Sequence, residues 1–232
     1  MTREERKAVC LISGGMDSAV AAAIAKAEGY DIYALSFDYG QRHKKELKCA
    51  GKLAKWLGAK EHRILSIGLG ALGGSALTSG AKVPTGKGYD EIKSSKEIPA
   101  TYVPARNTIF LSYALAYAEV LDAQAVYIGA NCMDYSGYPD CRPEYLEKFQ
   151  ELADLATRRG VVGGRIKIEA PLIRMSKEEI VKKAVEMKVP LEHTWSCYKG
   201  GALACGRCES CVLRLKGFEG AGIRDPLGYE SD

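Results

Sequence analysis

The sequence contains no uninterrupted apolar run of about 18 residues, the length that a membrane-spanning helix needs. Its N-terminus, MTREERKAVC, lacks the apolar core of a secretory signal peptide. The formal net charge of +4 is small for a chain of 232 residues, and it favours an acidic small molecule over nucleic acid as the ligand. We therefore expect a cytoplasmic protein that binds neither membranes nor nucleic acids.

Segments with the apolar patterns of strands and of helices alternate along most of the chain. The strand-like segments are residues 7–13, 31–37, 62–67, 125–130 and 166–170. The helix-like segments are residues 17–28, 41–57, 106–121, 143–158 and 176–188. This alternation predicts an α/β fold with a doubly wound parallel sheet, which binds ligands at the carboxyl ends of its strands.

Two of the expected helices carry additional signals. Residues 106–121 are apolar on nearly every face, which predicts a buried helix. Residues 176–188 begin with Ser176 and Glu179 at the spacing of a capping box. Residues 68–100, rich in Gly, Ser, Lys and Pro, are expected to form a long loop.

The first expected strand runs into the string SGGMDS at residues 13–18, directly before the first expected helix. Glycines let a ligand approach the backbone, serine hydroxyls add hydrogen-bond donors, and a helix N-terminus carries partial positive charge. We therefore expect this loop to bind an anion. Asp17 either holds Mg²⁺ there or caps the helix.

Two common nucleotide-binding motifs do not explain this loop. The chain has no G-x-x-x-x-G-K-[ST] string, which excludes a Walker-type loop. Gly68, Gly70 and Gly73 match the spacing of a dinucleotide fingerprint, but the following GSALTSGAKVPTG is no helix start. We interpret that match as chance.

Four of the eight cysteines, Cys197, Cys205, Cys208 and Cys211, are crowded near the C-terminus with the spacing C-x7-C-x2-C-x2-C. Four thiolates this close in sequence suit a tetrahedral structural zinc ion. Redox-active C-x-x-C pairs and an iron–sulfur cluster are the alternatives. A closed four-cysteine site has no open position, so its zinc would build structure and would not activate water.

The SGGMDS loop after a first strand resembles the signature of the N-type ATP pyrophosphatases, which split ATP into AMP and pyrophosphate. Further strings resemble one branch of that group, the 7-cyano-7-deazaguanine synthases of the queuosine and archaeosine pathways. The matching strings are YGQRH (39–43), SALT (75–78), VPARN (103–107), DYSGYPDCR (134–142), WSCY (195–198) and CGRCESC (205–211). One departure is Ala105, where we expect glycine about as often.

The resemblance covers about residues 8–217 and implies two parts. Residues 1–190 would form an ATP pyrophosphatase α/β domain, and residues 191–232 a small zinc-binding element packed on it. The implied enzyme is an ATP-dependent carbon–nitrogen ligase that converts 7-carboxy-7-deazaguanine and ammonia to 7-cyano-7-deazaguanine. It would release AMP and pyrophosphate in each of two rounds.

This chemistry is plausible on its own terms. A carboxylate resists ammonia until adenylation turns one of its oxygens into a leaving group, and ammonia then gives the amide. A second adenylation activates the amide oxygen, whose loss with AMP leaves the nitrile. The expected cofactors are ATP, Mg²⁺ and structural Zn²⁺, and the chain could act as a monomer or a homodimer.

The resemblance also implies roles for named residues. Asp17, Arg106 and Lys177 are candidate catalytic residues, although Arg106 could instead pair with a nearby acid and Lys177 could be a solvated lysine. The candidate nucleotide-binding residues are Leu11, Ile12, Ser13, Gly14, Gly15, Met16, Asp17, Ser18, Ala19 and Val20. The candidate substrate-binding residues, which would pair with or stack on a guanine-like ring, are Asp134, Tyr135, Tyr138, Asp140 and Arg142.

Two other functions compete with this interpretation. A tRNA-thiolating pyrophosphatase would need a reactive cysteine near ATP, a role open to Cys132 and Cys141, but the chain has no long basic RNA-binding extension. A zinc-ribbon nucleic-acid binder with a degenerate nucleotide fold is disfavoured by the intact SGGMDS loop. His43 could carry protons or be a structural histidine.

Overall fold

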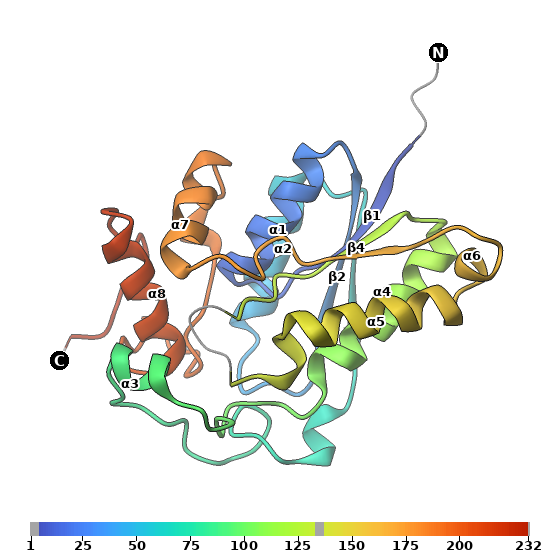
Figure 1. The fold of residues 1–232 in the computed structure, drawn as a ribbon. Coiled ribbons are helices and arrows are strands. Elements are labelled where there is room, and N and C mark those ends of the chain that lie inside the picture. Colours follow the sequence, from blue (N-terminus) through green and yellow to red (C-terminus); the bar gives the residue numbers. More distant parts are fainter. Residues whose placement is uncertain (1–4, 133–136, 232) are drawn as a thin grey trace.

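The computed structural model describes residues 5–132 and 137–231, and a parallel sheet lies at its centre (Figure 1). Its five strands are β1 (Lys7–Leu11), β2 (Asp31–Asp38), β3 (Glu61–Ser66), β4 (Ala125–Tyr127) and β5 (Lys167–Glu169). The strand order is β3-β2-β1-β4-β5, and every neighbouring pair is parallel. The chain first builds outward from β1 on one side and then resumes on the other, which confirms the doubly wound sheet and puts its switch point between β1 and β4.

Helices cover both faces of the sheet (Figure 1). The longer ones are α1 (Met16–Ala27), α2 (Lys45–Leu57), α4 (Arg106–Leu121), α5 (Pro143–Ala156), α7 (Lys177–Glu186) and α8 (Glu209–Gly220). Side chains alternate along each strand, so Ala8 and Cys10 of β1 pack with α1, α2 and α7, whereas Val9 and Leu11 pack with α4 and α5. The molecule therefore has two apolar cores, one on each face of the sheet.

Two expectations about helices need correction. Helix α4 has the expected bounds but is not buried all round, because Val120 is 78% exposed and Tyr113 44% exposed on its outer side. Helix α8 was not expected at all, since the cysteine spacing of its first turn obscures a helical pattern. The capping box of α7 is confirmed: the Ser176 side chain accepts from the Glu179 N–H, and the Glu179 carboxylate accepts from the Ser176 N–H.

The segment between β3 and α4, expected as a loop, contains a 3-10 turn (Leu69–Leu72) and the short helix α3 (Tyr89–Ser94). It is attached to the cysteine-rich region at three consecutive residues. Thr85 forms an antiparallel bridge with Cys208, the Gly86 N–H donates to the Arg207 carbonyl at 3.2 Å, and Lys87 pairs with Glu209. Residues 75–87 therefore connect the cavity described below, which Leu77 lines, to the region of the four cysteines.

The C-terminal residues are held by a buried ion pair. The Arg214 guanidinium of α8 bonds both carboxylate oxygens of Asp225, at 2.7 and 3.0 Å, and the two side chains are 2% and 4% exposed. Arg214 also donates to the Thr194 hydroxyl at 2.8 Å, and the Tyr229 hydroxyl donates to Asp225 at 2.6 Å. The pair therefore joins α8 to the chain on both sides of it.

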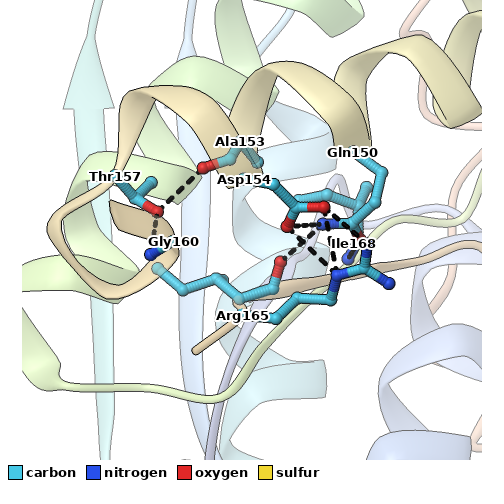
Figure 2. A network of polar contacts seen from close by, with 8 residues as sticks. Gln150, Ala153, Asp154, Thr157, Gly160, Arg165 and Ile168 are labelled. Atoms are coloured by element: carbon cyan, nitrogen blue, oxygen red, sulfur yellow. Dashed lines mark hydrogen bonds and ion pairs between the residues drawn. The ribbon is translucent and has the colours of Figure 1, made fainter. Parts of the chain in front are cut away.

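Figure 2 shows how the edge strand β5 is attached to α5. The Gln150 side chain accepts from the Ile168 N–H at 2.7 Å and donates to the Ile166 carbonyl at 3.1 Å. Asp154, one turn further on, pairs with Arg165 at 2.6 Å. An amide side chain thus takes the place of a further strand at an edge that would otherwise expose backbone groups. Among residues 5–132 and 137–231, no helix combines the length and apolar composition that crossing a membrane requires.

Candidate functional site

A cavity of about 320 Å³ lies at the carboxyl ends of β1, β2 and β4. Ile12 follows β1, Phe37 lies near the end of β2 and Gly129 follows β4, and all three line the cavity. The volume is within the range of known ligand sites. The cavity is therefore at the switch point of the sheet, the edge at which the strand–helix alternation predicts a ligand.

Hydrogen bonds among residues 13–18 set the shape of the loop between β1 and α1. The Ser13 N–H donates to the Ser18 hydroxyl at 3.2 Å, the Ser18 hydroxyl donates to the Gly15 carbonyl at 2.9 Å, and the Gly15 N–H donates to the Ser13 hydroxyl at 3.2 Å. Gly15 is the N-cap of α1, and no side chain caps this helix. The loop and the N-terminus of α1 thus have the geometry that the sequence predicts for an anion site, and we call residues 13–18 the anion loop.

Two glycines allow this loop to sit between its neighbours. Gly14 has φ +90°, and a Cβ atom there would lie 2.1 Å from the Glu46 carbonyl oxygen of α2. On the other side, a Cβ atom on Gly129 would lie 2.7 Å from the backbone of Asp17 and Ser18. The Trp195 N–H donates to the Gly14 carbonyl at 2.9 Å, so the C-terminal region is tied to the same loop.

Most of the predicted nucleotide-binding residues line the cavity: Leu11, Ile12, Ser13, Gly15, Met16, Asp17 and Ser18. Gly14, although part of the loop, is buried and does not line the cavity. Ala19 and Val20 are fully buried in the core between α1 and the sheet and do not reach the cavity, which corrects their predicted role. Small side chains at these positions hold α1 close to β1.

Asp17 and Lys177 form an ion pair at the mouth of the anion loop, and both line the cavity. Asp17 lies in the first turn of α1, and Lys177 is the first residue of α7. The alternative role of Asp17 as a helix cap is wrong, because no side chain caps α1. Lys177 is mostly buried and pairs within the site, so it is not a solvated lysine.

Arg106, the first residue of α4, lines the cavity between aromatic rings. Its guanidinium carbon lies 5.8 Å from the ring centre of Tyr39 and 6.0 Å from that of Phe110. Burial raises the pKa of the Tyr39 hydroxyl, and the Arg106 charge and hydrogen bond oppose that rise. Within the described residues Arg106 makes no ion pair with a carboxylate, so its charge is available to an acidic ligand.

Ala105, at the N-cap of α4, explains why glycine is a natural alternative there. Its backbone has φ 52° and ψ 23°, in the left-handed region that glycine adopts without strain. This bend directs Arg106 toward the cavity.

The predicted substrate loop is only partly a cavity wall. Tyr138 lines the cavity, with its hydroxyl 3.0 Å from the Thr101 hydroxyl and 3.4 Å from that of Tyr198. Asp140 is buried elsewhere and accepts from the Asn107 N–H at 2.9 Å, in the first turn of α4. Arg142 is exposed and donates to the Pro139 carbonyl at 3.2 Å.

Asp140 and Arg142 do not line this cavity; both line a shallower hollow beside α5. Asp140 acts instead as an acceptor at the N-terminus of α4. The other two predicted substrate residues, Asp134 and Tyr135, lie outside the described residues.

Several cavity residues had no predicted role. Tyr39, Glu46, Ser196, Tyr198 and Arg214 all line the cavity. The strings YGQRH and WSCY hold three of them, Tyr39, Ser196 and Tyr198, and were a usable signal, whereas Glu46 lies in an ordinary polar helix start. Glu46 is partly buried, and burial raises its pKa to about 7.

His43 is a wall residue rather than a surface histidine. Its Nε2 lies 3.1 Å from the Cys197 carbonyl oxygen, to which it must donate. Its Nδ1 is buried and has no hydrogen-bond partner in the described part of the chain. Burial lowers the pKa of His43.

The four C-terminal cysteines form one cluster. The Sγ atoms of Cys197, Cys205, Cys208 and Cys211 all lie within 4.8 Å of one another, and all four residues are buried. The Cys205 N–H donates to the Cys197 sulfur and the Cys208 N–H to the Cys205 sulfur, each at 3.3 Å. Buried thiolates with N–H donors are suited to hold a tetrahedral metal ion. The cluster adjoins the cavity, because Trp195 and Tyr198 flank Cys197 and line it.

The structure disfavours thiol chemistry at Cys132 and Cys141, for different reasons. Cys141 lines the cavity, but burial raises the pKa of its thiol to about 12. Cys132 lies outside the cavity wall and donates to the Ile173 carbonyl at 3.0 Å. A thiol nucleophile needs a lowered pKa, so burial disfavours a persulfide role for Cys141, whereas the position of Cys132 outside the cavity wall disfavours that role for Cys132.

Comparison with known proteins identifies the family. Residues 7–222 match the family model described as "Queuosine biosynthesis protein QueC". The chain is 56% identical to the 7-cyano-7-deazaguanine synthase of Acetivibrio thermocellus, over 97% of this chain and 98% of that one. It is 54% identical to the synthase of Desulfatibacillum aliphaticivorans, over 97% of each chain.

Among solved structures, an NH3-dependent NAD synthetase from Campylobacter jejuni is 19% identical over 83% of this chain and 68% of that chain, with a TM-score of 0.46. The near full-length matches carry the assignment, because they include both the anion loop and the four cysteines. The chain belongs to the QueC family of queuosine biosynthesis proteins.

Proposed function

We propose that this protein is a 7-cyano-7-deazaguanine synthase, which uses ATP to convert 7-carboxy-7-deazaguanine and ammonia to the nitrile. The main observation is that one cavity is lined both by the loop of residues 13–18 and by Arg106, a partly buried cation that pairs with no carboxylate among the described residues. Residues 13–18 would hold the pyrophosphate part of ATP, and Arg106 the carboxylate of the substrate. An acyl group and the α-phosphorus would thereby meet at the centre of the cavity.

Other residues of the cavity wall would supply aromatic surface for the substrate rings and charges for the departing pyrophosphate. Tyr39, Phe110, Tyr138 and Tyr198 offer aromatic surface for the purine-like rings of the two substrates. Asp17 would hold Mg²⁺, whose charge would neutralise the departing pyrophosphate. Lys177 would add a second positive charge at the same place. Each adenylation would release pyrophosphate, and each subsequent loss of AMP would complete one round.

The four-cysteine cluster would hold zinc. The donor set fits, because four buried sulfur atoms lie close enough to share one ion. A zinc ion there would supply structure alone, since four thiolates leave no open position. Its effect on catalysis would come through Trp195 and Tyr198, which join the cluster to the cavity wall.

The proposed setting is cytoplasmic, and the proposed substrate is a free base rather than nucleic acid. The small net charge supports this, and the cavity of about 320 Å³ has the size of a small-molecule site. A gel-shift measurement with tRNA should show no complex at concentrations at which the free base is converted.

The direct test is incubation of the purified protein with ATP, Mg²⁺, 7-carboxy-7-deazaguanine and ammonium, followed by mass analysis of the base. We expect the nitrile, with AMP and pyrophosphate in equal amounts. Omission of ammonium should stop the reaction after the first adenylation. A base of unchanged mass, with ATP intact, would overturn the proposal.

A further inference from the structure

Glu46 places a carboxyl group in the cavity wall without a partner. Among the described residues only two carboxyl side chains line the cavity, those of Asp17 and Glu46. Asp17 is paired with Lys177, whereas Glu46 makes no ion pair or side-chain hydrogen bond within the described part of the chain. A partly buried carboxyl group without donors is costly to ionise, which indicates a role other than stability.

Glu46 lies close to the loop that would hold ATP and lines the same cavity as Arg106, which would hold the substrate carboxylate. Its backbone carbonyl packs directly behind Gly14 of the anion loop, so its side chain starts next to the phosphate site. Arg106 lines the same cavity, and its charge lowers the pKa of Glu46, yet the two groups form no ion pair. The same cavity wall therefore presents a cation that attracts an acyl oxygen and a carboxylate that attracts a positively charged or proton-bearing nitrogen.

We propose that Glu46 binds the incoming ammonia and accepts its proton during attack on the adenylated carboxyl group. This proposal rests on the proposed synthase function and names the proton acceptor for it. The nitrogen lone pair forms the C–N bond while the carbonyl π pair moves to oxygen, and one N–H proton passes to a Glu46 oxygen. The oxygen pair then re-forms the carbonyl as the C–O bond to AMP breaks, and that bonding pair leaves with AMP.

The second round needs the same group. Glu46 first releases the proton of the first round to water. Adenylation of the amide oxygen gives an imidate cation with two N–H bonds, which loses one proton to water and leaves the neutral imidate with one N–H. That proton passes to Glu46 as its bonding pair forms the third carbon–nitrogen bond and the C–O pair departs with AMP. One proton acceptor at one place thus serves both rounds, as one ATP site does.

The electrostatic surroundings of Glu46 support this role. Burial raises the pKa of Glu46 to about 7, with Arg106 from α4 opposing the rise and Cys197 adding to it. Tyr39 and Cys49 also interact with its charge. A carboxyl group with this pKa takes up and releases protons near neutral pH, which is what a general base requires.

The other candidate bases are less well placed. The carboxylate of Asp17 is occupied by Lys177. His43 must use its Nε2 to donate to the Cys197 carbonyl, and its Nδ1 is closed off from the cavity space by burial. Asp140 does not line the cavity. Among residues 5–132 and 137–231, Glu46 is therefore the carboxyl group that both lines the cavity and has no ion-pair partner to compete with ammonia.

The test separates adenylation from ammonia transfer in Glu46→Gln. Without ammonium, pyrophosphate–ATP exchange driven by 7-carboxy-7-deazaguanine reports the first step alone, and we expect a rate within about threefold of wild type. With ammonium, amide formation should fall by about 10²-fold or more, the usual loss for a missing general base. Glu46→Asp should recover part of that loss, because the carboxylate is retained.

Glu61→Gln, a change of a carboxyl group on the edge strand β3, is the matched control and should leave both steps unchanged. Hydroxylamine, which is uncharged at neutral pH, should rescue Glu46→Gln more than it accelerates wild type. Ammonia transfer at a near wild-type rate in Glu46→Gln would overturn the proposal. So would an equal loss of exchange and transfer, which would indicate a structural role. Absence of exchange in wild type would instead refute the synthase function.

Discussion

Lys177 and Asp17 form an ion pair that joins the first turns of α7 and α1 across the anion loop. The carboxylate that would hold a metal ion thus has a protein cation as its partner when no metal is bound. Because both side chains are only partly exposed, the pair keeps two charges beside the place where pyrophosphate would form. When Mg²⁺ and ATP bind, the Asp17 carboxylate would exchange its contact with Lys177 for one with the metal ion, and Lys177 would then be free to contact a phosphate.

Asp17→Asn should abolish pyrophosphate release without unfolding the protein. An amide cannot supply the charge that a metal ion needs, but its oxygen can still accept a hydrogen bond from Lys177, which limits the loss of stability. Pyrophosphate release and thermal unfolding should be measured together. Lys177→Gln, which removes the partner, should lower kcat/KM for ATP less severely. Pyrophosphate release by Asp17→Asn at the wild-type rate would refute the metal role.

Gly14→Ala and Gly15→Ala form a matched pair that tests the anion loop. In Gly14→Ala the new Cβ would lie 2.1 Å from the Glu46 carbonyl oxygen at φ +90°, so loop and α2 must separate. We expect a loss of about 1–3 kcal/mol in the free energy of unfolding, measured with urea. In Gly15→Ala the nearest atom is 3.4 Å away and the backbone is extended, so stability should change by less than about 1 kcal/mol. Equal effects would show that the loop is not held against α2.

Cys197→Ser should lose most of the bound metal, because a hard hydroxyl replaces a soft thiolate in the four-sulfur cluster. The wild type should carry one zinc ion per chain and show no iron–sulfur absorbance. Cys49→Ser, outside the cluster, should keep its zinc. A lowered melting temperature is expected for Cys197→Ser, with activity falling only as far as folding does. Full zinc occupancy in Cys197→Ser would refute the four-ligand assignment.

The Arg214–Asp225 pair should behave as a buried unit. Asp225→Leu leaves a buried guanidinium unpaired, and we expect a loss of about 3–5 kcal/mol in the free energy of unfolding. The double variant Arg214→Met/Asp225→Leu should be more stable than Asp225→Leu, since no charge remains buried. Chemical unfolding of wild type, Arg214→Met, Asp225→Leu and the double variant completes the double-mutant cycle. Additive losses would show that the two residues act independently.

The ligand-free protein should become less stable relative to Glu46→Gln as pH rises. The Glu46 pKa is raised from the ordinary value of 4.5 to about 7, so the folded state holds this proton more tightly than the unfolded state. That stabilisation is fully present below about pH 4.5 and is lost as pH rises through 7. The stability of Glu46→Gln minus that of wild type should therefore grow by about 1–3 kcal/mol between pH 5 and pH 8. A pH-independent difference would refute the raised pKa.

The parallel sheet and the position of the cavity follow from local patterns that survive in the folded protein. Strands such as Lys7–Leu11 are apolar runs followed by helical periodicity, and that order alone dictates parallel pairing and a site at the carboxyl edge. The cluster of four cysteines was also predictable, because ligand spacing is local. Asp17 and Arg106 stand in strings whose composition already indicates chemistry.

The remaining wall residues are set by contacts distant in sequence. Nothing near Glu46 reveals that its carbonyl packs behind Gly14, and nothing near Arg214 reveals that α8 reaches the cavity. Asp140 was predicted to contact substrate because its loop has the composition of a binding site. Its carboxylate instead accepts a hydrogen bond from the Asn107 N–H at the start of α4. Which polar group faces a ligand and which faces the backbone is decided by tertiary packing.

The hydrogen bond from Trp195 to Gly14 closes the site with residues that the ribosome adds late. The anion loop emerges almost first, while the wall formed by Trp195, Tyr198 and Arg214 emerges some 180 residues later. Until residue 195 has been added, a growing chain has the loop of residues 13–18 without the opposite wall, so the cavity forms only when most of the chain is present.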